Sequence, residues 1–502
     1  MHHTKTKWGK KPQTFCIKLA TLFRSFAMGT SRTVASSSRR IVASELEDLY
    51  ALTIVSLNLN EAPRKSSRRP NDVLFHSKVY PFSFTVEEAL QKMKNLVLKK
   101  TNGSSITTIL CRLDHSSSLR VLSRFIDARL LHFPGDRTRK EVMMGAVLQP
   151  TAKGIFLLSR CYTRQGLGVE SLKSLLASQY NSMECFTFDR QPQTDAIVTS
   201  ECLVHLLFEK FMGTGPNYYN PALSHEFGKN PISQRSPYAH RYYTHPDSDA
   251  LTQYYNSEGV RLFANHPVGG GTRVPWCFTG RAAFQWLVEC TDAMSSREAC
   301  ELANTFVRSG LVVRIGVDEE ARRMDFSKNS FYLLTEKGRQ VCQWTRNVNE
   351  VVTSSRELTD CSLDMVLGDA GLRLLFRKHL EKDFCQENLN FYTDFQRFKS
   401  EYRRHQGGHQ KSTVTAIYTL TDRYLSSGAP QQLNLNSQLS SEISKVIRRL
   451  DSSGSEAAEK CNQLLLQAES EVYKMMETDS LPKFLKSQEF EMAKRIFAYQ
   501  LS

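Results

Sequence analysis

The stretch D-F-C-Q-E-N-L-N-F-Y, residues 383–392, decides how the C-terminal part of this chain folds. In it an acidic and an amide side chain, Glu387 and Asn388, stand directly before apolar residues at helical spacing. The spacing predicts an amphipathic helix that starts near this pair. Such a pair is a common way to begin a helix, so it gains a functional meaning only from the segments around it. The apolar positions of the helix are Leu389, Tyr392, Phe395, Phe398 and Tyr402.

A second stretch, D-S-L-P-K-F-L-K at residues 479–486, follows about ninety residues later. Asp479 and Ser480 are favourable helix-capping residues, so we expect a new helix to start there. Pro482 would then fall in its first turn, where proline is tolerated. Further apolar helix positions and one polar turn accompany the two stretches: Leu372, Leu375, Phe376, Ile417, Leu420, Tyr424, the turn 433–436, and Val472 to Met476.

The order of these segments resembles the regulator of G-protein signalling (RGS) box from end to end. The paired motifs E-N-L-x-F-aromatic and D-S-x-x-x-F-L-K make the resemblance specific. It implies an all-α helical bundle over residues 360–497. It also implies a GTPase-activating protein for a heterotrimeric G-protein α subunit (Gα), with no catalytic site of its own and no cofactor.

In the RGS family, loop ends at one pole of the bundle contact the switch segments of Gα. Three positions of this chain depart from the family pattern: Cys385 replaces a common serine, Met475 a leucine and Lys483 an arginine. Lysine lacks the bidentate geometry of arginine, so the rate and the Gα selectivity are in question more than the activity. The resemblance places the contacts at Phe384, Cys385, Glu387, Asn388, Asn434, Met475, Asp479, Ser480 and Lys483.

An internal repeat lies upstream of the RGS-like segment. Three short segments recur in the same order, beginning with F-T and ending with T-x-K-G. The first copy is about thirteen residues longer between its first two segments, which predicts an insertion near the polar stretch 101–118. The matching pairs are 84–91 with 278–285, 125–130 with 306–311, and 151–154 with 335–338.

Each copy is expected to form two helices, two short strands and a closing helix, which is a winged-helix shape. The second strands are expected at Gly145 to Leu148 and Phe331 to Leu334. The second copy, residues 263–346 with W-C-F-T-G at 276–280, resembles the DEP domain. The first copy, residues 78–165, is similar but lacks the tryptophans and the glycine.

Two DEP-like modules before an RGS box resemble the architecture of fungal developmental regulators of the FlbA type and of pheromone-desensitising factors. The expected fold is therefore multidomain and mainly α: two winged-helix (DEP-like, α+β) domains followed by an all-α RGS bundle. Residues 166–215 are expected to form a helical and strand-like extension. Residues 216–262, rich in Tyr, Pro, Asn and Ser, are expected to be a linker.

The DEP resemblance implies recruitment to a receptor cytoplasmic tail or to the anionic inner membrane surface. The protein would then be cytoplasmic and peripherally associated with the plasma membrane. Arginine suits planar contacts with phosphate, although any single arginine can simply be part of a solvated basic surface. The second copy supplies Arg281, Arg297, Arg308, Arg314, Arg322 and Arg323.

The N-terminal segment, residues 1–77, is expected to be a basic, largely disordered arm with one short helix. Residues 1–40 carry nine Lys or Arg and no acid. The helix is expected from Ser44, where S-E-L-E predicts a capping box. Two other interpretations of the basic tail are an interfacial helix over Phe15 to Phe26 and a mitochondrial transit segment.

The remaining composition argues against other classes of protein. A chain of 502 residues predicts two to four domains, and no run of eighteen apolar residues predicts a membrane span. The 12 cysteines are scattered without a C-x-x-C pair, which predicts reduced thiols and no zinc site. No nucleotide-binding, serine-hydrolase or zinc-protease motif is present.

Two alternative functions stay open. The chain could be an RGS-fold scaffold that binds Gα without accelerating it. It could also be a winged-helix nucleic-acid-binding protein, given a pI near 9.2. The basic residues of the second copy are spread over loops and wing, which counts against nucleic acid.

Overall fold

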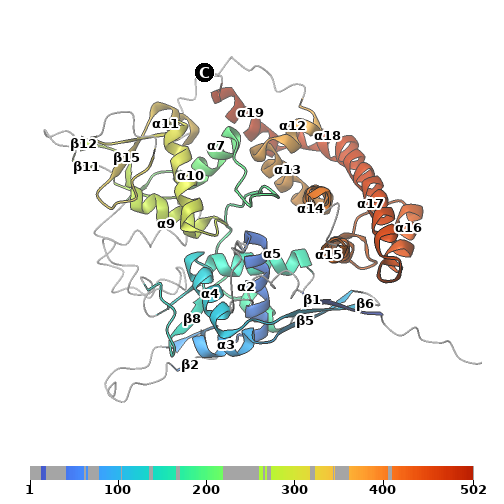
Figure 1. The fold of residues 1–502 in the computed structure, drawn as a ribbon. Coiled ribbons are helices and arrows are strands. Elements are labelled where there is room, and N and C mark those ends of the chain that lie inside the picture. The colour runs from blue at the N-terminus through green and yellow to red at the C-terminus, as the bar shows by residue number, and fades with distance from the viewer. Residues whose placement is uncertain are drawn as a thin grey trace, which may run out of the picture.

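The computed structural model describes most of the chain: residues 13–18, 41–61, 64–65, 79–102, 105–134, 139–165, 170–218, 259–263, 266–267, 273–316, 323–342, 344, 361–404 and 410–500. The elements form three groups, and helix α7 (Glu201–Met212) packs between the second and the third of them (Figure 1). We call them the first unit (helix α2 and residues 79–165), the second unit (residues 273–342) and the RGS bundle (residues 361–500).

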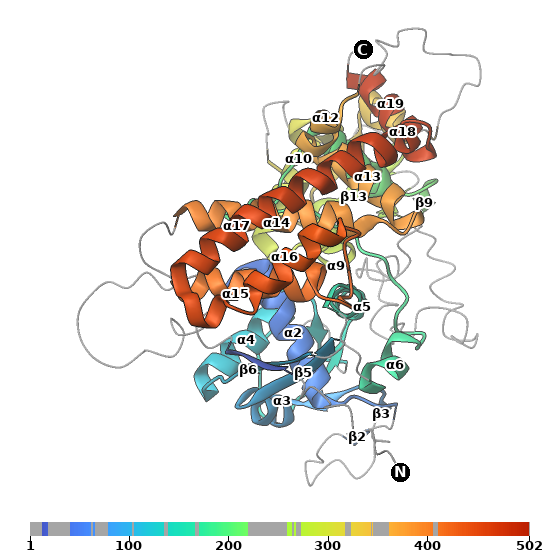
Figure 2. The same cartoon turned by 90° about the vertical axis from the view of Figure 1, so that its right-hand side faces the viewer.

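The RGS bundle is all helical, as expected. The stripe predicted from residues 383–402 forms one long helix whose Leu389, Phe395 and Phe398 are buried. Figure 2 shows the longest helix, α17, lying along α14 and α16. The helices are α12 (Leu363–Gly368), α13 (Ala370–Lys382), α14 (Gln386–Arg404), α15 (Gln410–Leu420), α16 (Ser437–Ile447), α17 (Leu450–Met475), α18 (Leu481–Phe484) and α19 (Gln488–Gln500), with π-helical turns at Thr421–Leu425 and Met476–Ser480.

The first unit has a small antiparallel sheet of strand order β4-β8-β7. Its last strand begins two residues later than predicted, at Val147. Helix α3 starts at a true capping box, because Thr85 accepts the Glu88 N–H and Glu88 accepts the Thr85 N–H. The elements are α2 (Ala43–Leu57), β4 (Phe84–Thr85), α3 (Val86–Met93), α4 (His115–Asp127), β7 (Leu131–His132), β8 (Val147–Pro150) and α5 (Ala152–Gln165).

The second unit repeats this order, with a sheet of strand order β13-β15-β14. The strand predicted at Phe331 to Leu334 is confirmed with both of its ends. Thr279 caps helix α9 as Thr85 caps α3. The elements are β13 (Cys277–Thr279), α9 (Gly280–Cys290), α10 (Ser296–Arg308), β14 (Val312–Arg314), β15 (Phe331–Leu334) and α11 (Glu336–Cys342).

The recurring T-x-K-G segment has the same geometry in both units. The Thr151 and Thr335 hydroxyls each donate to a carbonyl before a wing strand, at 2.5 and 2.6 Å. The same hydroxyls accept the N–H groups of Gly154 and Gly338, at 2.9 and 3.0 Å. Only glycine fits there, because a β-carbon would lie 2.3 and 2.1 Å from the carbonyl oxygens of Leu130 and Leu311.

The predicted insertion in the first copy is a β-hairpin between α3 and α4. Its strands are β5 (Leu96–Asn102) and β6 (Ser105–Cys111), and a strand at Gln13–Lys18, β1, pairs parallel with β6. Helix had been one interpretation of residues 15–26. Residues 13–18 are instead a strand, and Thr, Phe and Ile in it are strand-favouring residue types; residues 19–40 lie outside the described residues.

Helix α2 confirms the helix predicted near Ser44 but corrects its cap and its place. The helix starts at Ala43, whose N–H donates to the Asp195 carboxylate at 2.7 Å. A distant acid therefore takes the capping role that the sequence assigned to Ser44. The helix packs against α3 and α5, with Leu46, Tyr50 and Ile54 fully buried, so it belongs to the first unit and not to an N-terminal arm.

Helix α7 has the same place beside the second unit that α2 has in the first. Phe208 and Phe211 each lie 5.1 Å, by ring centroids, from Phe306. In the first unit Tyr50 lies 5.3 Å from Phe125, the counterpart of Phe306 in the repeat. The expected extension 166–215 thus contains a core helix of the second copy.

The remaining described elements are short. Residues 219–258, most of the expected linker, lie outside the described residues. These elements are β2 (Arg64–Lys65), β3 (Val79–Tyr80), α6 (Glu170–Leu176), β9 (Asn217–Tyr218), β10 (Arg261–Leu262), β11 (His266–Pro267) and β12 (Arg273–Val274).

Candidate functional site

The first part of the site is the loop between α13 and α14. Phe384 has a left-handed backbone (φ 53°) and a side chain that is 89 % exposed. Glu387 and Asn388 lie in the first turn of α14. A left-handed backbone is costly for a bulky residue such as Phe384, and aromatic residues are enriched in protein–protein interfaces.

Glu387 and Asn388 differ in their exposure. Asn388 is buried, and its N–H donates to the Cys385 carbonyl at 3.3 Å. Glu387 is half-buried, and this burial raises the pKa of its carboxyl above the usual range. Among the described residues no cation pairs with Glu387. A half-buried carboxylate without a cation destabilises the fold slightly and is available to a partner.

The second part of the site is a continuous helical segment, not a new capped helix. Ser480 has helical backbone angles (φ −74°, ψ −41°) and a buried side chain. The Leu481 N–H bonds to the Met476 carbonyl five residues back, so α17 passes through a π-helical turn into α18. The predicted cap at Asp479 and Ser480 is therefore wrong, whereas Pro482 does lie in the first turn of α18.

The structure brings these two parts together. Cys385 lies close to both parts: burial and the charges of Glu387 and Asp383 raise the pKa of its thiol above the usual range, and Ser480 and Lys483 of the second part act in the opposite direction. Ninety residues of sequence therefore separate neighbours in space. Phe484 fixes α18 against α13, with its ring 5.2 Å from that of Phe376.

The exposed end of the second part carries an ion pair. Asp479 Oδ2 and Lys483 Nζ are 2.9 Å apart, one helical turn from each other, and both are largely exposed. The hydrogen bond to Asp479 raises the pKa of Lys483. Met475 lies at the end of α17, half-buried against the bundle core.

Asn434 lies on a third segment, the loop before α16, and is exposed. Buried Leu433 holds this loop through an N–H bond to the Tyr424 carbonyl, and Asn436 caps α16 by accepting the Gln438 N–H. The Asn436 N–H reaches Glu471 on α17. These bonds tie the loop to the bundle but not directly to the segments 384–388 and 479–483.

The arginines predicted for the second unit do not form one cluster. Arg314 is occupied by Asp325 at 3.0 Å and Arg308 lies 3.7 Å from Glu301. Arg297 and Arg308 lie near opposite ends of α10, about 16 Å apart along the helix. Arg281 and Arg323 are exposed, and Arg322 lies outside the described residues.

Neither metal nor membrane insertion has a structural counterpart in the described residues. No group of three His, Cys, Asp or Glu side chains there could hold a metal ion. Within the same residues, every helix is too short or too polar to cross a bilayer.

Two protein families match this chain. The fungal-differentiation regulator winged helix domain matches residues 45–178, and the regulator of G protein signaling domain matches residues 362–493. The first match begins at α2, which agrees with the packing of that helix.

Two fungal proteins are similar over most of the chain. The developmental regulator flbA of Emericella nidulans is 28 % identical over 482 residues, covering 88 % of this chain and 62 % of that protein. Regulator of G-protein signaling 1 of Schizosaccharomyces pombe is 23 % identical over 483 residues, covering 90 % of each chain. The chain thus spans under two thirds of the length of flbA.

A mammalian protein is similar over a shorter region. Regulator of G-protein signaling 7 of Rattus norvegicus is 29 % identical over 136 residues, 26 % of this chain and 25 % of that protein. With its RGS bundle and N-terminal winged helix, the chain is a fungal RGS protein related to flbA and to the fission yeast regulator.

Sequence reasoning missed the residues that join the units. Asp189, Arg373 and Arg377 meet between the RGS bundle and the segment 177–200, and Lys153 of the first unit inserts into the second. One signal was available for α7, because Ser-Glu stands at 44–45 and again at 200–201, near the start of both helices. No local pattern marks Asp189.

Proposed function

We propose that the protein is a GTPase-activating protein for a heterotrimeric Gα and so terminates receptor signalling. The observation that carries the proposal is the bundle at residues 362–493, which matches the RGS domain and in which the Phe376 and Phe484 rings, 5.2 Å apart, hold the D-S segment against the helix that precedes the E-N segment. The names of the relatives agree with this role in signalling.

The chemistry requires no catalytic group from this chain. Gα has its own arginine in cis and hydrolyses GTP at about 10⁻² per second. An activator that holds the switch segments in the transition-state arrangement accelerates the reaction tenfold for every ~1.4 kcal/mol of preferential binding. Carboxylate and amide groups such as Glu387 and Asn434 can bond to exposed switch backbone, and charge-assisted bonds are the stronger ones.

The two upstream units are proposed to recruit the bundle to a receptor tail or to the anionic inner membrane surface. Their shared topology supports reading the second unit as a DEP-like domain over about residues 263–346. The location would then be the cytoplasmic side of the plasma membrane. Because the arginines of the second unit are dispersed and partly ion-paired, the recruiting contact is not assigned to them as a group.

Single-turnover GTP hydrolysis by the Gα subunits of the source fungus tests the proposal. The full chain should raise the rate with at least one Gα, and Glu387→Ala and Asn434→Ala should lose most of the effect while keeping the folded circular dichroism spectrum. Asn329→Ala removes an exposed amide of the second unit and should be silent. An unchanged hydrolysis rate with every Gα would contradict the proposal.

The scaffold alternative makes a different prediction. A protein that only docks would bind Gα in its transition-state mimic, GDP with aluminium fluoride, no more tightly than in its GTP form. An activator must bind the mimic more tightly.

A further inference from the structure

A cavity of about 1180 Å³ lies where the RGS bundle, the first unit and the segment 177–200 meet. Charged side chains of both signs line it, and most of them form ion pairs. Arg160 pairs with Glu47 within the first unit, and the pairs Arg160–Asp292, Arg164–Asp394 and Arg495–Glu209 cross the junction. The arginines that line the cavity are thus largely neutralised by carboxylates of this chain. They therefore hold the units together and are not free to bind an anion.

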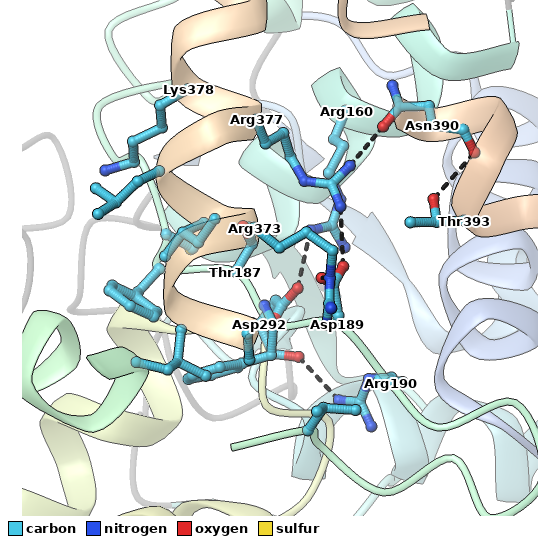
Figure 3. A pocket seen from close by; sticks show the side chains of 18 of the residues that line it. Arg160, Thr187, Asp189, Arg190, Asp292, Arg373, Arg377, Lys378, Asn390 and Thr393 are labelled. Carbon is cyan, nitrogen blue, oxygen red and sulfur yellow. Dashed lines mark hydrogen bonds and ion pairs between the residues drawn. The ribbon is translucent and has the colours of Figure 1, made fainter. Parts of the chain in front are cut away.

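Asp189 is the centre of the contact with the RGS bundle. Its carboxylate lies 2.5 Å from Arg373 and 2.9 Å from Arg377, both on α13 (Figure 3). Burial opposes the charge of Asp189, but Arg377 and Arg373 overcome it and lower the pKa of the carboxyl. The group is therefore ionised at neutral pH and holds two arginines of one helix.

Arg377 extends this contact to the next helix. One guanidinium nitrogen bonds to Asp189 and the other donates to Asn390 Oδ1 on α14, at 2.5 Å (Figure 3). The bond joins Arg377 on α13 to Asn390 on α14, and the segment with Phe384, Glu387 and Asn388 lies between these two residues in the chain. The Arg377–Asn390 bond joins the two helices across the loop, and closing a short loop in this way reduces the conformations open to it.

The other end of the connection is the second unit. The Phe186 N–H donates to the Cys290 carbonyl and the Asp292 N–H donates back to Phe186, both at 2.9 Å. The Phe188 N–H donates to the Asp292 carboxylate at 3.2 Å. Residues 186–189 therefore bond to the end of α9 on one side and to the RGS bundle on the other.

The start of α13 is held by the same segment. The Ser200 hydroxyl lies 3.0 Å from Asp369 Oδ1, the N-cap of α13, and accepts the Gly371 N–H at 3.2 Å. The start of α13, through Asp369 and Gly371, and its middle, through Arg373 and Arg377, are thus contacted from outside the RGS domain.

We propose that Asp189 is a positioning residue for the proposed Gα-contact segment, residues 384–388. Through Asp189 the second unit sets the geometry of this segment. Asp189 does not touch Gα. It acts through Arg377 and Asn390 by restricting the arrangement in which Phe384, Glu387 and Asn388 are presented. The part that concerns Gα rests on the proposed function.

The test uses the full chain carrying Asp189→Asn, which keeps the size and removes the charge. We expect the single-turnover acceleration to fall about three- to tenfold, and backbone amides 384–390 to exchange hydrogen several times faster. Asp189→Glu restores a carboxylate and should recover most of both effects. Asp195→Asn is the matched control, because Asp195 lies in the same segment but bonds to Ala43 and not to the bundle.

The outcomes separate the two proposals. If the wild-type chain accelerates no Gα, the proposed function fails. The positioning role of Asp189 is then tested by hydrogen exchange at residues 384–390 alone. If Asp189→Asn matches Asp195→Asn in acceleration and exchange, the positioning role is overturned. Should Asp189→Asn not fold, Arg377→Lys, which cannot reach both Asp189 and Asn390, takes its place, and unchanged exchange at 384–390 overturns the proposal equally.

Discussion

A β-carbon on Gly371 would lie 2.6 Å from the Sγ atom of Cys202, so the RGS bundle and helix α7 cross in direct contact at a glycine. The RGS domain is therefore packed onto the N-terminal half of the chain and is not an independent domain joined to it only by a linker. Arg373 and Arg377 lie on the same helix a few residues further on, so α13 contributes both the close crossing and the two arginines paired with Asp189.

Gly371→Ala should loosen this crossing. The new methyl group also meets the Leu203 backbone nitrogen at 2.6 Å, which cannot move aside as a side chain can, and such overpacking costs about 1–3 kcal/mol. We expect a lower urea midpoint and faster proteolysis between the units. Gly368→Ala is the control, because nothing lies within 4 Å of its added β-carbon; equal midpoints for the two variants would contradict the close packing.

Phe384→Asn should separate binding from stability. Asn tolerates a positive φ, so relief of a strain of about 1–2 kcal/mol should leave stability unchanged or slightly raised. Loss of the exposed ring should weaken binding to Gα in its transition-state mimic. Phe384→Leu retains an apolar side chain and should bind more tightly than Phe384→Asn, and titration calorimetry with urea unfolding measures both quantities.

Glu387→Gln should stabilise the protein at neutral pH while it lowers the acceleration. The folded pKa of Glu387 is above its unfolded value, so its contribution to stability is present below the unfolded pKa and is lost as pH rises through the folded pKa. The variant should therefore exceed the wild type in stability at pH 7 and converge with it near pH 4. A wild type that is the more stable protein at pH 7 would show that Glu387 has a favourable partner in the folded chain.

Lys153→Met tests the contact between the first and second units. The buried Lys153 ammonium donates to the carbonyls of Val288 at 2.8 Å and Ala293 at 2.5 Å, and burial lowers its pKa to about 8. Between pH 8 and the usual lysine value near 10.5 the unfolded chain holds a proton that the folded chain has released, so rising pH favours the folded wild type.

The stability of the wild type relative to Lys153→Met should therefore increase between pH 8 and 10, by up to ~1.4 kcal/mol per pH unit. Tyrosines and cysteines that titrate in the same range are common to both proteins and cancel in the difference. Chemical unfolding of both proteins at pH 7, 8, 9 and 10 measures this difference. A difference that is constant over the range would mean that Lys153 titrates normally.

Much of the fold and of the candidate site could be predicted because the information is local. The helical stripe after Glu387, the first-turn position of Pro482 and the T-x-K-G repeat all depend on neighbours within one or two turns of chain. The predicted cap at Ser480 was wrong because the same residue types also fit inside a continuous helix. The π-helical turn there is selected by the burial of Met476, Ser480 and Phe484 against the bundle.

The sequence by itself determined the helical stripes of the RGS bundle and the repeated segments of the two upstream units, because both are encoded by periodicity and short motifs; the residues that would contact Gα stay a prediction from the family resemblance. Only the tertiary structure decided that α2 and α7 complete the two units, and that Asp195 caps α2. It alone also placed Asp189 between the second unit and the loop at Phe384. Ion pairs and close helix crossings join residues more than a hundred positions apart, and no spacing along one chain encodes which distant carboxylate an arginine will meet.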